Sequence, residues 1–199
     1  MYPLLETIKL LDGRLYNLPY HNARLNAARR EYFGVYETLD LREYISIPAD
    51  KQVGLYRCRV IYAPGIQSIE FLAHEYRNIR SLKLVEDNSI DYRYKYADRR
   101  HLERLFEQRG DCDDILIVKN GCITDSYTAN PIFFDGRTWW TPDTPLLPGT
   151  QRARLLEEKI IFERRITPAD LPLYQKVGLV NALQDLADMS VVEIAGGLS

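Results

Sequence analysis

The chain has 199 residues, of which 46% are hydrophobic and 27% charged, as in an ordinary globular protein of one large or two small domains. The net charge of -2 gives no general attraction for nucleic acid, and no apolar run approaches the roughly 18 residues of a membrane helix. Its N-terminus lacks a secretory signal pattern, and Cys58, Cys112 and Cys122 form no CxxC pair. We therefore expect a cytoplasmic protein without disulfides or a metal site, and without a nucleic-acid or membrane partner.

The first part of the sequence predicts a small antiparallel α+β domain over residues 1–85. Its expected elements are, in chain order, strands over 4–11 and 14–18, a helix over 21–33, and strands over 53–63 and 66–74. Asp12-Gly13 is a typical hairpin turn, and Gly34 is placed to end the helix. The polar stretch 76–94 is interpreted as an irregular crossover to a second domain.

Residues 86–199 predict a larger domain built on a β-meander or barrel-like sheet with helices. Its expected elements are a helix over 98–109, strands over 115–118, 122–126, 131–134 and 138–141, a helix over 153–158, and a helix start at Thr167-Pro168. Asn120-Gly121 and Asp135-Gly136 each predict a two-residue hairpin turn between strands. The fold class expected from the whole chain is therefore α+β with two domains.

The run Leu147-Pro148-Gly149-Thr150-Gln151-Arg152 has the composition of an anion seat. A Pro-Gly turn leads into a helix, whose first N–H groups and positive dipole end favour a phosphate. Taken alone, such a turn more often marks only the start of a helix.

Two residues upstream strengthen the interpretation. Lys95 lies between Tyr94 and Tyr96, where neighbouring rings and arginines would favour the neutral amine that attacks a carbonyl cofactor. Asp125 ends a meander strand, and a buried carboxylate there could keep a pyridine nitrogen protonated, so that the ring accepts electrons. The simpler alternatives are a solvated lysine and a turn acid. Together with the anion seat, the two residues indicate a pyridoxal-phosphate site.

Arginines in the first domain supply further candidates. His21 and Arg24 share a helix face, so Arg24 could pair with a phosphate while His21 holds Arg24 or the backbone. Arg57 and Arg59 alternate on one strand face and could bind a substrate carboxylate, although a solvated face is the slightly favoured interpretation.

The order of these motifs resembles the class IV aminotransferase family of fold type IV pyridoxal-phosphate enzymes. That family includes branched-chain and D-amino-acid aminotransferases and 4-amino-4-deoxychorismate lyase. The matching segments are Leu5-Glu6-Thr7, His21 to Leu25, Lys95, Asp125 to Phe133, Leu147 to Arg152, and more weakly Gly178 to Leu183. The resemblance covers nearly the whole chain.

The resemblance implies that Lys95 links covalently to the cofactor and moves the proton. It implies that Arg24 and the backbone N–H groups of Thr150 and Gln151 hold the phosphate. Asp125 stands where the family usually has Glu, and Gln151 where many members have Thr. The full expected cofactor set is Arg24, Lys95, Asp125, Thr128, Ala129, Asn130, Gly149, Thr150 and Gln151, with Arg57, Arg59 and Arg99 as substrate-binding candidates.

The opening strand and the His-x-x-Arg-Leu helix most resemble the lyase branch, which implies release of pyruvate and 4-aminobenzoate in folate biosynthesis. The alternative is an aminotransferase acting on branched-chain or D-amino acids. A third possibility is a non-catalytic binding protein on the same scaffold, supported only by the departures at Asp125 and Gln151. The resemblance also implies a homodimer.

Overall fold

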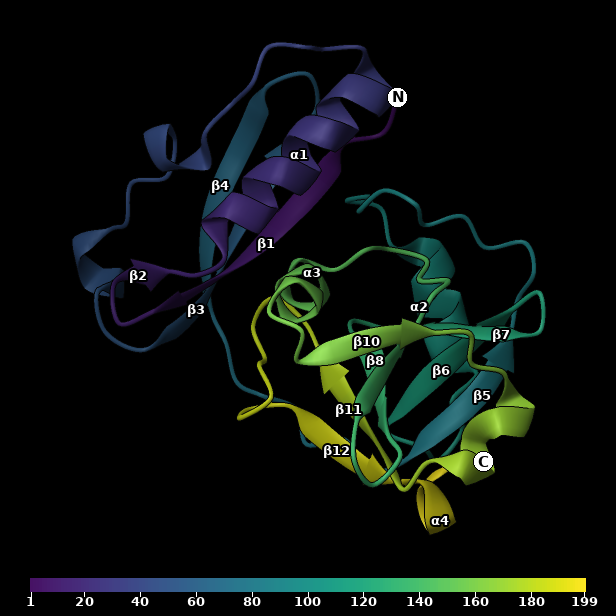
Figure 1. Ribbon diagram of the computed structural model, residues 1–199. Coiled ribbons are helices and arrows are strands. Elements are labelled where there is room, and N and C mark those ends of the chain that lie inside the picture. The colour runs from purple at the N-terminus through teal and green to yellow at the C-terminus, as the bar shows by residue number, and fades with distance from the viewer. The chain divides into compact units, whose positions relative to one another are not determined.

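The computed structural model describes residues 1–199 and divides into two compact units (Figure 1). The first unit comprises residues 1–75 and 94–98, and the second comprises 76–93 and 99–199. This division differs from the expected boundary after residue 85. The stretch interpreted as irregular contains strand β5 (Leu82–Glu86), which pairs in parallel with strand β6 (Asp114–Lys119) of the second unit. Residues 94–98, in contrast, return to the first unit.

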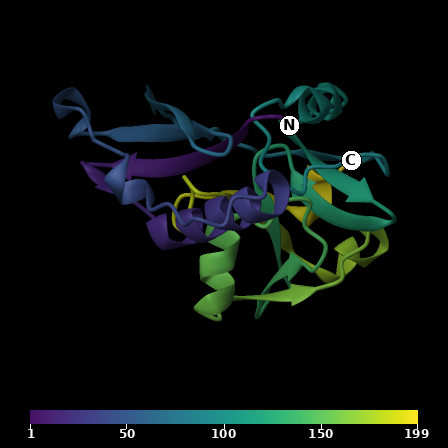
Figure 2. The same cartoon turned by 90° about the horizontal axis from the view of Figure 1, so that it is seen from above.

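The first unit is an antiparallel sheet in the order β2-β1-β3-β4, with one helix on one face (Figure 2). Its elements are β1 (Leu4–Leu11), β2 (Arg14–Leu15), α1 (Leu18–Phe33), β3 (Leu55–Tyr62) and β4 (Ile66–Ala73), with short 3-10 turns η1 (Leu41–Glu43) and η2 (Ala49–Lys51). The side chains of Leu4 and Ile8 from β1 pack with Leu25 of α1 in the core. The expected helix and the strands over 4–11, 53–63 and 66–74 are confirmed within a few residues, whereas the strand expected over 14–18 is only the two residues of β2.

Helix α1 begins three residues before the expected start and ends where expected. Asn17 adopts a left-handed conformation that turns the chain, and Pro19 occupies the first helical turn, where its missing N–H costs nothing. Gly34 ends the helix with φ of 72°, and its N–H donates to the carbonyl oxygen of Arg29. These ends place His21 and Arg24 in the first two turns of α1.

The second unit contains two sheets, in the orders β10-β9-β8-β11-β12 and β5-β6-β7 (Figure 1). Its remaining strands are β7 (Cys122–Ser126), β8 (Asn130–Phe134), β9 (Trp139–Pro142), β10 (Ile161–Arg164), β11 (Lys176–Val180) and β12 (Ser190–Glu193). The four meander strands are confirmed, and the sheets form no closed barrel. The sequence did not reveal β5 or β10 to β12. Strand β10 buries only Ile161, so it lacks the alternation that identifies a strand.

Four helical segments complete the second unit: α2 (Arg100–Glu107), α3 (Thr150–Glu157), η3 (Pro168–Leu173) and a short turn, α4 (Ile194–Gly197). The start at Thr167 is confirmed by a capping box, in which Thr167 and Asp170 bond to each other's backbone N–H groups. The segment is a 3-10 helix, because Pro172 lies inside it and cannot continue an α-helix. Helix α3 starts directly after Gly149.

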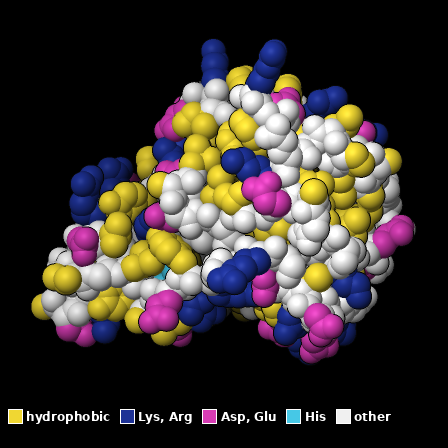
Figure 3. Space-filling view, turned by 90° about the horizontal axis from the view of Figure 1, so that it is seen from below, with side chains coloured by type: hydrophobic (Ala, Val, Ile, Leu, Met, Phe, Trp, Pro, Cys, Tyr) yellow, Lys and Arg dark blue, Asp and Glu magenta, His cyan; other side chains and the backbone are white.

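None of the helices combines the length and apolar character that crossing a membrane requires. Basic and acidic side chains are interspersed among apolar ones on the face drawn in Figure 3.

Candidate active site

In the first unit, the buried carboxylate of Glu6 contacts the side chains of His21 and Arg24. Glu6 lies on the face of β1 that packs against α1, and neither its side chain nor that of His21 is exposed. The Nδ1 of His21 lies 2.6 Å from one carboxylate oxygen of Glu6, and Arg24 donates from Nε and from an η nitrogen at 2.9 and 2.6 Å. Arg24, predicted to hold a phosphate, is therefore oriented by Glu6. His21 contacts that same carboxylate.

The charges in this cluster have definite preferred states. Burial alone would raise the pKa of Glu6, but the charge of Arg24 and the hydrogen bonds from His21 and Arg24 outweigh it and lower that pKa to about 2. Burial lowers the pKa of His21, against the opposing effect of Glu6 and in the same direction as the charges of Arg24 and Lys95. The cluster thus consists of a carboxylate, a guanidinium and a neutral imidazole.

Lys95 lies in the returning segment 94–98, which runs beside the start of β1. The N–H of Leu5 donates to the carbonyl oxygen of Lys95 at 2.8 Å, and the N–H of Ala97 donates to that of Pro3 at 2.9 Å. Backbone bonds therefore fix Lys95 beside the strand residue that precedes Glu6. The half-buried Lys95 and Arg24 both act electrostatically on His21, so the first unit gathers these three residues.

Arg57 and Arg59 point to the sheet face opposite α1. They pair across the strands with Lys9 and Thr7 of β1. Arg59 donates to Glu70 of β4 at 3.0 Å, whereas the buried Nε of Arg57 has no hydrogen-bond partner. Of the two, Arg57 is the better candidate for binding an anion.

In the second unit, Asp125 is almost fully buried at the end of β7 and accepts three hydrogen bonds. The side-chain amide of Asn130 donates to Oδ1 at 2.5 Å, and the backbone N–H groups of Leu146 and Leu147 both donate to Oδ2. Burial raises the pKa of Asp125 to about 7 although these donors oppose it. The acid therefore joins strand β7 to the turn that precedes α3.

Asn130 provides a second connection to that turn. Its amide also donates to the carbonyl oxygen of Leu147 at 3.0 Å. Its Oδ1 lies so close to Gly149 that a Cβ at position 149 would overlap it. Glycine is required there by the close approach of Asn130, since the φ of Gly149 is an ordinary -70°.

Helix α3 begins with the residues expected to hold a phosphate. Thr150 and Gln151 are buried, Gly149 contributes no capping side chain, and the first turn contains no acid. Such an N-terminus suits an anion because of its backbone N–H groups and dipole. The side chain of Gln151 donates to Asp185 at 2.7 Å. One N–H of its amide is therefore engaged by residues 181–189.

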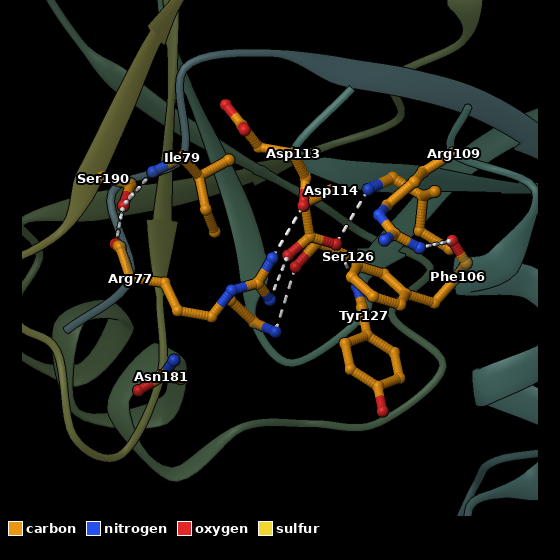
Figure 4. Close-up of polar contacts among 12 residues, drawn as sticks. Arg77, Ile79, Phe106, Arg109, Asp113, Asp114, Ser126, Tyr127, Asn181 and Ser190 are labelled. Carbon is orange, nitrogen blue, oxygen red and sulfur yellow. Dashed lines mark hydrogen bonds and ion pairs between the residues drawn. The ribbon is translucent and has the colours of Figure 1, made fainter. Parts of the chain in front are cut away.

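The turn after Asp125 is held in place by Asp114 of β6 (Figure 4). The N–H of Tyr127 donates to the fully buried Asp114, whose pKa burial raises and which Arg77 approaches at 3.5 Å. Arg99 donates to the carbonyl oxygen of Tyr127 at 2.7 Å, and its guanidinium lies 4.5 Å from the centre of the Tyr127 ring. Arg99 thus stabilises this turn through its contacts with Tyr127.

The three residues expected to contact the cofactor, in this turn and at the start of β8, differ in exposure. Thr128 is exposed, whereas Ala129 and Asn130 are buried. Sequence reasoning missed Glu6, Asp114 and Asp185 as site residues. Only Glu6 had a signal, since it is a charged residue among Leu4, Ile8 and Leu10 on the inward face of β1.

Comparison with known proteins identifies the family. The family model described as amino-transferase class IV matches residues 3–192, and the chain therefore belongs to this family of pyridoxal-phosphate-dependent enzymes. An uncharacterized protein of Haemophilus influenzae is 39% identical over 188 residues, covering 94% of this chain and all of that protein.

Two solved structures define the similarity in three dimensions. A candidate 4-amino-4-deoxychorismate lyase from Haemophilus somnus is 35% identical with a TM-score of 0.88, covering 94% of this chain and 98% of that one. The branched-chain amino acid aminotransferase of Escherichia coli shares the fold, with 14% identity and a TM-score of 0.71 over 100% of this chain and 80% of that one.

Proposed function

We propose that this protein is a lyase that converts 4-amino-4-deoxychorismate into 4-aminobenzoate and pyruvate. The observation that carries the proposal is the 35% identity to the Haemophilus somnus candidate lyase over nearly the full length of both chains. The two proteins also agree in fold at a TM-score of 0.88.

The residues present fit the phosphorylated pyridine cofactor of the family. The acid-free start of α3 suits its phosphate through the N–H groups of Thr150 and Gln151, with Arg24 as the assigned counter-charge. Asp125 suits a protonated ring nitrogen, because its buried carboxylate is otherwise met only by N–H donors. Lys95 is assigned the covalent link. Gly149 and the turn residues Thr128, Ala129 and Asn130 complete the proposed cofactor set.

When bound, the cofactor supplies an electron sink for the carbon next to the substrate amine. Lys95 is proposed to remove the proton from the ring carbon that bears the amino group and to return a proton to the departing enolpyruvyl group. The carbon–oxygen bond to that group breaks, pyruvate leaves, and the six-membered ring becomes aromatic. Arg57, Arg59 and Arg99 are the proposed carboxylate-binding residues, with Arg57 and Arg99 favoured over Arg59 because each has a buried Nε without a hydrogen-bond partner.

The competing function is amino-group transfer, favoured by the family's name and by the shared fold of the branched-chain enzyme. The test offers purified holoenzyme 4-amino-4-deoxychorismate and, separately, branched-chain or D-amino acids with a keto acid. Formation of 4-aminobenzoate and pyruvate in equal amounts supports the lyase. A new amino acid without 4-aminobenzoate supports the transferase. A colourless protein that binds no cofactor would support the non-catalytic scaffold instead.

We also propose that the protein acts as a cytoplasmic homodimer in folate biosynthesis. Two-fold dimers are the commonest closed assembly of soluble proteins. Sedimentation equilibrium at micromolar concentration should give twice the 23.2 kDa chain mass. A fully active species with the mass of one chain would disprove the dimer.

A further inference from the structure

The segment between β11 and β12 runs beside α3 in Figure 1. One acid of this segment, Asp185, binds it to the start of that helix. Asp185 accepts the side-chain amide of Gln151 at 2.7 Å through one oxygen and a guanidinium N–H of Arg154 through the other. Both donors belong to α3. A single carboxylate therefore joins residues 181–189 to two positions of that helix that lie about one turn apart.

The segment 181–189 is itself well ordered around Asp185. The backbone N–H groups of Asp188 and Met189 donate to the carbonyl oxygen of Asp185, and the N–H of Leu186 donates to its carboxylate. Leu186 and Met189 pack against the apolar cluster that contains Leu155 of α3. Movement of Asp185 would thus be transmitted to the rest of the segment and to the helix.

An acid so close to a proposed phosphate seat needs an explanation, because its charge would oppose an anion. Arg154 provides that explanation, since it pairs with Asp185 and, in the next turn, with Glu158 at 3.1 Å. With this counter-charge beside it, the carboxylate can serve as an acceptor for the buried amide of Gln151. The residue that departs from the family pattern at position 151 is therefore used by this chain for a second purpose.

We propose that Asp185 is a positioning residue for the phosphate group of the cofactor. By fixing the side chain of Gln151, it fixes the backbone N–H that Gln151 contributes to the seat, and it couples phosphate binding to the order of residues 181–189. This inference rests on the proposed cofactor role of α3. Preorganised donors bind an anion without the cost of ordering them at that moment.

The test compares pyridoxal phosphate with pyridoxal, which lacks the phosphate, in titrations of the cofactor-free full chain. Asp185→Ala should lower the ratio of the affinity for pyridoxal phosphate to the affinity for pyridoxal by about fivefold or more. Asp185→Asn keeps an acceptor for Gln151 and should stay close to wild type. Glu158→Ala is the matched control, because it removes the other partner of Arg154 and leaves the bond to Gln151 intact.

Each result decides the proposal. An unchanged affinity ratio in Asp185→Ala would overturn the proposal. An equal rise of that ratio in Asp185→Ala and Asp185→Asn would also overturn it, because it would mean that the acid only repels the phosphate. If wild type binds neither compound, the proposed function fails, and inorganic phosphate becomes the probe. Phosphate should then slow hydrogen exchange in residues 181–189 of wild type and not of Asp185→Ala, and equal exchange in both would also overturn it.

Discussion

The side-chain oxygen of Asn130 lies where the Cβ of any larger residue at position 149 would have to go. Only glycine at position 149 therefore leaves room for Asn130 in its observed position. The amide nitrogen of the same Asn130 bonds to Asp125 and to the carbonyl oxygen of Leu147. The proposed ring-nitrogen contact and the proposed phosphate seat are consequently built on one shared side chain.

Gly149→Ala should therefore displace Asn130, loosen the turn before α3 and weaken cofactor retention. Overpacking of this kind typically costs about 1–3 kcal/mol of folding stability. Gly65→Ala is the matched control, because no atom lies within 4 Å of its added Cβ. Thermal unfolding and cofactor release measured on both variants check the prediction. Equal behaviour of the two would show that the turn adapts freely.

Lys95 should carry the cofactor. Reduction of the holoenzyme with borohydride, followed by peptide mass mapping, should place the label on Lys95, because the backbone fixes this residue beside the Glu6 cluster. Lys9 is the informative comparison, as it is a buried lysine on the same strand as Glu6. A label on Lys9 or on any other lysine would refute the assignment.

Glu6→Gln should be strongly destabilising, because it leaves Arg24, with a side chain only 16% exposed, without its counter-charge. The expected cost is about 3 kcal/mol or more. Glu70→Gln, which breaks the more exposed pair with Arg59, should cost less than about 1 kcal/mol. Urea unfolding of both variants measures the contrast, and similar costs would mean that Arg24 finds another partner.

The contribution of Glu6 should also depend on pH in a definite direction. Its pKa is lowered from 4.5 to about 2 on folding, so the stabilisation is complete above 4.5 and is lost as pH falls toward 2. The difference in unfolding free energy between wild type and Glu6→Gln should shrink over that window. A difference independent of pH would show that the carboxylate is not held ionised.

Asp125→Asn should reduce both turnover and stability. The ring nitrogen would lose its partner carboxylate, at a typical cost of about 3 kcal/mol in the transition state, or a rate about a hundredfold lower. From the sequence alone, a loss of turnover is expected if Asp125 contacts the cofactor ring, and a loss of stability only if it caps a turn. In the structure Asp125 also accepts three N–H donors, so an amide NH2 there would face a donor. Turnover per bound cofactor and the melting temperature should both fall, and near wild-type turnover would remove Asp125 from the site.

Burial of Asp125 gives the opposite pH dependence in the cofactor-free protein. Its pKa is raised from 3.8 to about 7 on folding, so folding is favoured while the group is protonated. The unfolding free energy of wild type relative to Asp125→Asn should fall as pH rises from about 4 to about 7 and then stay constant. Urea titrations at several pH values test this, and a rise over that range would contradict the buried state.

The sequence predicted the parts of the fold whose signals are local. Asn120-Gly121 forms the expected hairpin with both residues at positive φ, and Gly34 ends α1 as its position indicated. Strands β11 and β12 escaped prediction because their identity depends on pairing with β8 and with each other. Periodicity over four or five residues cannot distinguish such segments from loops.

The same limit applies to the candidate site. Residue types and motif order singled out Lys95 and Asp125, because their chemistry is carried by the residue itself. The roles of Glu6, Asn130 and Asp185 lie in their contacts with residues far along the chain, at separations of 15 to 34 positions. Only the folded chain brings these groups together.

The interleaving of the chain between the two units restricts how such a protein can be altered by cutting or recombination. Residues 94–98 belong to the first unit although residues on both sides of them belong to the second. A gene fragment ending near residue 75 would encode the sheet and α1 without Lys95, and a fragment starting near 76 would encode Lys95 without the strand that anchors it. Exchange of whole terminal domains between relatives would therefore separate the lysine from its support. We expect viable chimeras of this family to arise by substitution within the units.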